Sequence, residues 1–184
     1  AGTKYINGHS DTLIGFVSSD KKHAKTIRVV TKTLGICPGS EEVYLALRGL
    51  PTLNLRMKQI ESNALELARE LNKHPIVDKV YHPAIETSEN HNIWKRDFTG
   101  STGLFSFSLK KFYPQSKIKK MFSKISIFKL GYSWGGYDSL ITFPPLSKRK
   151  FKTLLKGNLI RVYCGLEDSS DQIKDIINSL KTLK

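Results

Sequence analysis

The chain has 184 residues, of which 30 are Lys or Arg and 16 are Asp or Glu, so its formal charge is +14. This length suits one domain, or one and a part; the 39% hydrophobic content excludes a disordered chain, and no apolar run approaches the ~20 residues that a membrane span needs. The two cysteines, Cys37 and Cys164, are too few for a disulfide framework and lie in no metal-binding spacing, which predicts a cytoplasmic protein without a metal site.

The first part of the chain predicts one strand and two helices. The apolar run from Leu13 to Val17 is typical of a strand. A helix capped at Ser18-Ser19-Asp20 is expected to run to about Thr33, before the turn residues Pro38-Gly39. Ser40-Glu41-Glu42 then opens a second helix, because acidic side chains in the first turn interact favourably with the helix dipole.

The clearest predicted element is a long helix after Gly49-Leu50-Pro51. Its apolar residues recur at spacings of three and four, the pattern of one helix face. They are Leu53, Met57, Ile60, Ala64, Leu67 and Leu71. His74-Pro75 ends this helix, and the run from Val77 to Tyr81 predicts a strand that Pro83 closes.

The remainder alternates short strands with helices. Strands are predicted at Leu104 to Leu109, near Ser139 to Thr142 and at Leu159 to Tyr163, and a weakly amphipathic helix at Gln115 to Ser123. A final helix follows the polar start Asp168-Ser169-Ser170. Its apolar face comprises Ile173, Ile176, Ile177 and Leu180. Helices interleaved with strands predict an α/β or α+β fold.

Lysines concentrate in two stretches, Lys110 to Lys129 and Lys148 to Lys156. A sequence pI near 9.8 would suit a nucleic-acid-binding protein. The stretches are poor in arginine, however, which is the residue suited to bidentate phosphate and guanine contacts. The aromatic residues among them also fit a stripe facing the core, and no nucleic-acid-binding motif is present. We therefore expect a solvated lysine-rich surface rather than a nucleic-acid interface.

Three segments carry groups that could bind or transform a small molecule. Residues 3–11 hold Lys4 beside hydroxyl, imidazole and carboxylate groups, and a deprotonated lysine can attack an aldehyde. Residues 131–139 combine aromatic, hydroxyl and glycine residues, which suits a loop against a small ligand. Arg161 lies within an apolar strand and needs an anion, for which a carboxylate has the matching shape. The residues alone leave simpler interpretations open: a surface lysine, a turn, and an arginine paired within the protein.

Five segments, in order along the chain, resemble the pyridoxal-phosphate-dependent transsulfuration enzymes, the family of the cystathionine γ-synthases, γ-lyases and β-lyases. The segment Thr3-Lys4-Tyr5-Ile6-Asn7-Gly8-His9-Ser10-Asp11 is similar to the signature around that family's cofactor lysine. Leu47 to Leu53, continued by Arg56-Met57, is similar to its interdomain helix. Residues 94–101 and 132–140 resemble the β-lyase branch in particular, and residues 159–168 fit the family's ending.

The resemblance implies a role for each matching residue. Lys4 would bind the aldehyde of pyridoxal 5'-phosphate covalently and later move protons on the substrate, and Thr3 would help to hold the cofactor phosphate. Ser133 and Trp134 would line the substrate pocket, and Arg161 would bind the substrate α-carboxylate. The implied reaction is the α,β-elimination of L-cystathionine to homocysteine, pyruvate and ammonia, a carbon-sulfur lyase step of methionine biosynthesis. A γ-lyase or γ-synthase is the alternative within the family, and a non-catalytic basic binding module the alternative outside it.

The implied fold is the C-terminal part of a fold-type I, aspartate-aminotransferase-like enzyme. Residues 1–73 would form the end of the large cofactor-binding domain with the interdomain helix, and residues 74–184 the smaller C-terminal α+β domain. Because the cofactor lysine lies near the middle of the family's chains, we expect a truncated or split-gene fragment with little activity alone. Its expected small-molecule partner is cystathionine. Its expected protein partner is either another copy of the chain, in a homo-oligomer, or a separate N-terminal half. Apolar surface should be exposed where that half belongs.

Overall fold

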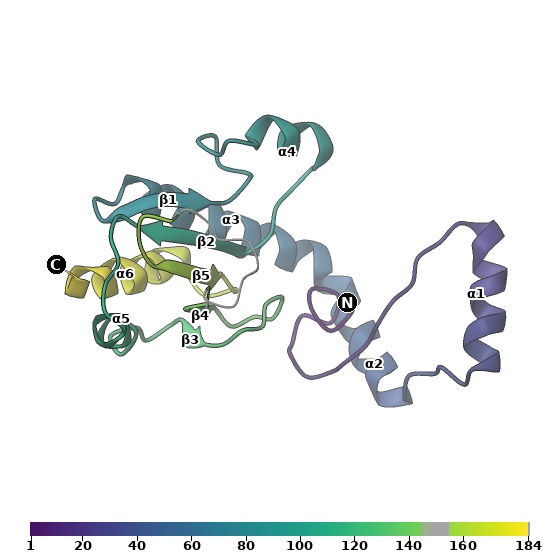
Figure 1. Ribbon diagram of the computed structural model, residues 1–184. Coiled ribbons are helices and arrows are strands. Elements are labelled where there is room, and N and C mark those ends of the chain that lie inside the picture. The colour runs from purple at the N-terminus through teal and green to yellow at the C-terminus, as the bar shows by residue number, and fades with distance from the viewer. Residues whose placement is uncertain (145, 147–154, 184) are drawn as a thin grey trace.

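The computed structural model describes residues 1–144, 146 and 155–183, and its strands form a five-stranded sheet (Figure 1). The strands are β1 (Val77–Tyr81), β2 (Leu104–Leu109), β3 (Lys129–Leu130), β4 (Leu140–Thr142) and β5 (Leu159–Tyr163). Their order across the sheet is β1-β2-β5-β4-β3, and neighbouring strands are antiparallel except β3 and β4. The mixture of helices and strands confirms the predicted fold class.

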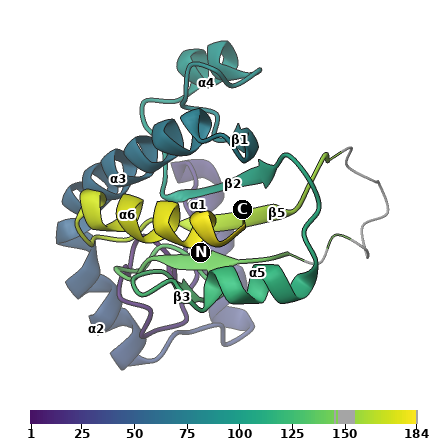
Figure 2. The same cartoon turned by 90° about the vertical axis from the view of Figure 1, so that its left-hand side faces the viewer.

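Helices cover one face of this sheet and form the core with it (Figure 2). On that face, α3 (Leu53–Lys73) packs against α6 (Ser169–Leu180), while α5 (Gln115–Phe122) and the 3-10 helix η3 (Lys181–Leu183) continue the layer. The apolar spacing predicted for the long helix explains its packing, because Ala64 and Leu67 belong to the same buried cluster as Phe107 of β2 and Ile160 of β5. A large side chain such as Leu67, Phe107 or Ile160 contributes about 1.5–3 kcal/mol when fully buried.

The segment before α3 extends away from the sheet. The helix α1 (Lys21–Thr33) begins at its predicted cap, where Asp20 Oδ1 accepts a hydrogen bond from the His23 backbone N–H at 2.9 Å, yet none of its residues is buried. Two further elements, α2 (Ser40–Gly49) and the 3-10 helix η1 (Leu50–Thr52), lead into α3. Figure 1 shows α1 set apart from the sheet, with a connecting segment on each side.

The predicted strand from Leu13 to Val17 is wrong, because these residues have no regular secondary structure. A strand needs a neighbour for its N–H and C=O groups, and none of the described strands pairs with this run. Leu13 and Val17 of this run are 83% and 76% exposed, and Ile14 is partly buried. The other predicted helices and strands are confirmed to within a few residues, while α4 (His91–Asp97) and the short strand β3 were not anticipated.

The lysines between residues 110 and 129 are exposed, whereas Tyr113 and Phe128 are buried. These two aromatic residues therefore face the core, whereas Phe122 is partly buried and Phe112 is 67% exposed, so the predicted core-facing stripe is confirmed only in part. The exposed lysines agree with the predicted solvated lysine surface. Most of the second lysine stretch, Lys148 to Lys156, lies outside the described residues. Both cysteines are free thiols, and no helix within the described ranges has the length and apolar character to cross a membrane.

Candidate functional site

A hollow of about 670 Å³ lies where three segments distant in the sequence meet. Thr3 and Lys4 line it from the N-terminal turn, Glu41 and Glu42 from the start of α2, and Ser133 from the loop between β3 and β4. The structure thus brings together two of the three segments that the sequence singled out for chemistry.

Lys4 is held in place by that loop. Its Nζ donates a hydrogen bond to Ser133 Oγ at 2.9 Å, although the two residues are 129 positions apart, and it lies 4.5 Å from the centre of the Trp134 ring. The hydroxyl accepts from the amine while the ring face attracts its positive charge. Together these contacts direct the amine to the part of the hollow beside Ser133.

The loop can approach Lys4 closely because a glycine lies at the point of contact. Gly135 has a φ of +86°, and a Cβ built on it would lie 2.8 Å from the Lys4 carbonyl carbon. Only glycine tolerates both the backbone conformation and this proximity. Behind the loop, the buried Tyr163 hydroxyl donates to the Gly136 carbonyl at 2.8 Å, and burial raises the pKa of Tyr163, so that the donor keeps its proton. Tyr163 therefore anchors the loop to β5.

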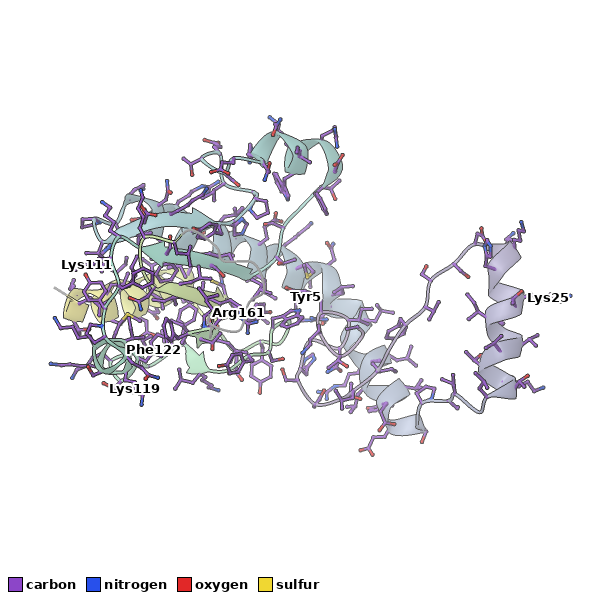
Figure 3. The ribbon with its side chains drawn as sticks, viewed as in Figure 1. Tyr5, Lys25, Lys111, Lys119, Phe122 and Arg161 are labelled. Carbon is purple, nitrogen blue, oxygen red and sulfur yellow. The ribbon has the colours of Figure 1, made fainter. Side chains whose placement is uncertain are left out.

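Arg161 reaches the same loop from the sheet. It alternates along β5 with Ile160 and Val162, which face the core, so its side chain leaves the opposite face. Its Nη2 donates to the Tyr132 carbonyl at 2.5 Å, and its Cζ lies 5.9 Å from the ring centres of both Tyr132 and Trp134. In Figure 3, Arg161 is labelled at the end of the sheet that is nearer to Tyr5. The Trp134 ring therefore has two cationic groups beside it, one from Lys4 and one from Arg161.

Thr3 lines the hollow, but its hydroxyl is engaged within the turn. Its Oγ1 accepts from the Ile14 backbone N–H at 2.9 Å and donates to the Ile14 carbonyl at 3.3 Å. Carboxylates of Asp11, Glu41 and Glu42 line the same hollow. These carboxylates would repel an anion placed next to Thr3, because like charges repel. The lining is better suited to an uncharged carbonyl group next to Lys4. In the described part of the chain, no cluster of His, Cys, Asp and Glu could hold a metal ion.

Sequence reasoning missed the residues that support these side chains. The Glu167 carboxylate accepts from the backbone N–H and the hydroxyl of Ser139, both at 2.7 Å, and thereby fixes the end of the loop that carries Ser133. Arg56 is buried beneath the N-terminal turn. Its position three residues after Leu53 and four before Ile60 places it on the apolar face of α3, and that spacing is the signal that could have revealed it.

Comparison with known proteins finds one matching family and similar relatives. The sequence matches the family described as Cys/Met metabolism PLP-dependent enzyme over residues 1–181. It is 39% identical to cystathionine beta-lyase MetC of Escherichia coli (strain K12) over 96% of this chain and 46% of that protein. It is 38% identical to the L-alanine/L-glutamate racemase of Wolbachia pipientis wMel, over 100% of this chain and 46% of that protein.

A solved structure is similar as well. The crystal structure of cystathionine gamma synthase from Xanthomonas oryzae pv. oryzae, in complex with aminoacrylate and cysteine, matches with a TM-score of 0.84 and 28% sequence identity. The match covers 98% of this chain and 48% of that one. This chain therefore spans about half the length of the relatives that it matches.

Proposed function

This chain belongs to the Cys/Met metabolism PLP-dependent enzyme family, and we propose that it supplies the cofactor lysine, Lys4, and part of the substrate pocket of such an enzyme. The predicted cofactor, pyridoxal 5'-phosphate, is that of the family, and the similarity to the γ-synthase structure confirms the expected fold, part of a fold-type I enzyme. One observation carries the proposal for Lys4, which lines a hollow of about 670 Å³. Its amine lies 2.9 Å from Ser133 Oγ and next to the Trp134 ring.

The residues around the hollow fit the aldehyde end of this cofactor. Lys4 supplies a primary amine in a defined position, which is what a covalent bond to an aldehyde requires. At the phosphate end the chain offers Thr3, whose hydroxyl already bonds within the turn, and carboxylates that would repel a phosphate. We therefore infer that Thr3 contributes one phosphate contact and that the remaining donors come from the part of the family's length that this chain does not span.

Each residue of the proposed site then has a separate task. When bound here, pyridoxal phosphate would supply an electron sink for the substrate α-carbon, so that a thiol could leave from the β-carbon. Lys4 Nζ would hold the cofactor through its aldehyde and would accept the proton from the substrate α-carbon. Ser133 Oγ, as the acceptor of the Lys4 hydrogen bond, orients that amine. Arg161 binds the α-carboxylate with its fork of N–H groups, and Trp134 forms the wall between them.

Within the family, we propose the β-lyase reaction, from L-cystathionine and water to homocysteine, pyruvate and ammonia. Support comes from the relative named cystathionine beta-lyase and from the β-lyase-like segments at residues 94–101 and 132–140. Relatives named as a racemase and a γ-synthase match a comparable share of this chain, so the reaction must be identified from its products. Elimination at the β-carbon of cystathionine yields pyruvate, whereas elimination at the γ-carbon yields 2-oxobutyrate.

A surface on the N-terminal part of the chain suits the packing of further polypeptide. Large apolar side chains are exposed along residues 13–55, where the sheet does not cover them. They include Leu13, Phe16, Val17, Val30, Leu34, Ile36, Tyr44, Leu47 and Leu55. We propose that this surface receives the remaining half of an enzyme of the family's usual length, in a homo-oligomer or from a separate chain. The division into residues 1–73 and 74–184 and the cytoplasmic location stay predictions.

The proposal for Lys4 is tested by mixing the purified chain with pyridoxal phosphate. We expect a visible absorption band, and borohydride reduction followed by mass spectrometry should place the cofactor on Lys4. Lys4→Ala should abolish the band and leave the denaturation curve almost unchanged, whereas Lys25→Ala, on the exposed helix α1, should change neither. A band that survives Lys4→Ala would refute the assignment.

Activity and the competing function need separate measurements. Because the chain spans about half the length of its relatives, we expect little thiol release from cystathionine by this polypeptide alone. If the chain were instead a basic binding module, its affinity for a nucleic acid would be measurable and would fall steeply with salt as counterions are released. The absence of such salt-dependent binding would remove that alternative.

A further inference from the structure

Arg56 of α3 lies beneath the turn that carries Lys4 and is only 6% exposed. Its Nη1 donates to the Tyr5 carbonyl at 2.7 Å, and its Nη2 donates to the Ile6 carbonyl at 3.2 Å. The same guanidinium donates from Nη2 to the Gly49 carbonyl at 2.8 Å and from Nε to Thr52 Oγ1 at 3.0 Å. One side chain therefore ties the N-terminal turn to the junction between α2 and α3.

All four acceptors of Arg56 are neutral oxygens. Among the described residues, no carboxylate forms an ion pair with it, and burial lowers the pKa of the guanidinium below its ordinary value. A buried cation is costly unless its donors are satisfied, so the planar fork must meet these oxygens in a defined arrangement. Lysine, with a single ammonium group, cannot reproduce that arrangement.

The turn is shaped to receive the guanidinium. Gly8 has a φ of +74°, and a Cβ built on it would lie 1.9 Å from Arg56 Nη1, so a side chain there would take the place of the guanidinium. A Cβ on Gly49, at the end of α2, would lie 2.2 Å from the Asn7 carbonyl oxygen. The backbone of Ile6 and Asn7 therefore contacts Gly49 at the end of α2 directly, and the Arg56 guanidinium fills the space next to Gly8.

We propose that Arg56 is a positioning residue for Lys4. It holds the turn through the carbonyls of Tyr5 and Ile6, while Gly135 contacts the Lys4 backbone. Held between these two contacts, the Lys4 backbone keeps its amine within hydrogen-bonding distance of Ser133. The inference rests on the proposed cofactor role of Lys4 for its functional meaning, but the contacts themselves can be tested without any cofactor.

The first test is amide hydrogen exchange on the full chain. The Asn7 and Gly8 N–H groups donate to the carbonyls of Gly2 and Lys4 within the turn, so their exchange reports whether the turn is closed. In Arg56→Met and Arg56→Lys, exchange over residues 2–8 should accelerate by about tenfold or more, while exchange in the central strands β2 and β5 stays as in the wild type. Arg69→Met is the matched control, because Arg69 is an exposed arginine of the same helix, and it should leave exchange over residues 2–8 unchanged.

The second test measures the reactivity of Lys4. Each variant is treated with pyridoxal phosphate and borohydride over a range of pH, and modification of Lys4 is quantified by mass spectrometry against that of the exposed Lys25. Both Arg56 variants should slow the labelling of Lys4 about tenfold or more relative to Lys25, and the Arg69 variant should not.

The outcomes separate the two proposals. Unchanged exchange over residues 2–8 would overturn the positioning role, because Arg56 would then be dispensable for the turn. An equal increase of exchange over residues 2–8 and over β2 and β5 would also overturn it, because Arg56 would then support the whole fold. Local acceleration together with slower labelling of Lys4 is the expected result. If the wild-type chain is not labelled at Lys4 while the exchange result is as expected, the cofactor role of Lys4 fails, and Arg56 remains the residue that closes the turn.

Discussion

Replacing Asp175 with alanine should destabilise the chain more than any change at an exposed carboxylate. The Asp175 side chain, 8% exposed on α6, accepts hydrogen bonds from four donors just before β3. Oδ1 accepts from the Ser126 N–H at 2.8 Å and its hydroxyl at 3.0 Å, and Oδ2 accepts from the N–H groups of Ile127 and Phe128 at 2.8 and 3.1 Å. This carboxylate fixes the segment that leads into the loop of Ser133.

The magnitude follows from which donors water can reach once the carboxylate is gone. Ser126 is exposed and can be hydrated, so its two bonds are largely replaced. Phe128 is 4% exposed and Ile127 is partly buried, so their N–H groups lose charge-assisted bonds worth about 1.5–3 kcal/mol each. We therefore expect Asp175→Ala to lower the free energy of unfolding by about 3–6 kcal/mol, a large part of a typical domain's total. Asp175→Asn, which keeps one acceptor oxygen, should cost roughly half as much.

Urea denaturation followed by circular dichroism and tryptophan fluorescence measures both changes. The control is Asp171→Ala, on the same helix, because Asp171 is exposed and pairs with Lys174 at 3.3 Å. Its effect should be much smaller, since exposed ion pairs contribute little. If Asp175→Ala were no more destabilising than this control, water would be replacing the carboxylate at all four donors and the reasoning would be wrong.

Three further changes have defined outcomes. Arg161→Lys keeps the charge but loses the bidentate fork, so it should weaken the binding of L-cystathionine about tenfold or more and the binding of the cofactor much less. Both are measured through the visible cofactor band. Equal losses of the two affinities would indicate a purely structural arginine. Burial lowers the pKa of His82, so the unfolded chain binds a proton that the folded chain excludes, and the free energy of unfolding measured in urea should fall as the pH drops below about 6.5. His82→Gln should remove that part of the slope, and an unchanged slope would exclude His82 as its source. Iodoacetamide should modify the exposed Cys37 in the folded chain but reach Cys164 only after unfolding. The reason is that Cys164 is buried and that burial raises the pKa of its thiol. Peptide mapping that finds Cys164 modified before unfolding would contradict this.

Helices were predictable where the pattern that defines them is local. The apolar spacing of α3 and the cap at Asp20 depend only on residues within the helix or next to it, and both are confirmed. The strand predicted at Leu13 to Val17 failed because pairing depends on a partner that the run itself does not contain. The two-residue strand β3 shows the converse, because it forms only by pairing in parallel with β4 and has no pattern of its own.

The residues of the candidate site were singled out by the resemblance and not by their spacing. Composition alone left Lys4 as a surface lysine, and nothing local connects it to Ser133, which is 129 positions away. The family signature singled out both residues, and the fold brings them within 2.9 Å. The supporting contacts escaped prediction because they run between side chains and backbone carbonyls, as Arg56 shows with its bonds to Tyr5 and Ile6, and a sequence pattern does not display where a carbonyl points.

The net charge of +14 is a poor guide to what the hollow binds. Figure 3 shows Lys111 and Lys119 at one end of the molecule, Lys25 on α1 at the other end, and Tyr5 between them. Charges on exposed side chains are screened by salt over about 8–10 Å, so those lysines act mainly on what approaches their own surface. The hollow is lined by one lysine and three acidic residues, and Arg161 lies outside this lining, beside the Trp134 ring. The binding of pyridoxal phosphate should therefore depend on Lys4 and the closed turn above Arg56, and hardly on the lysines of α5.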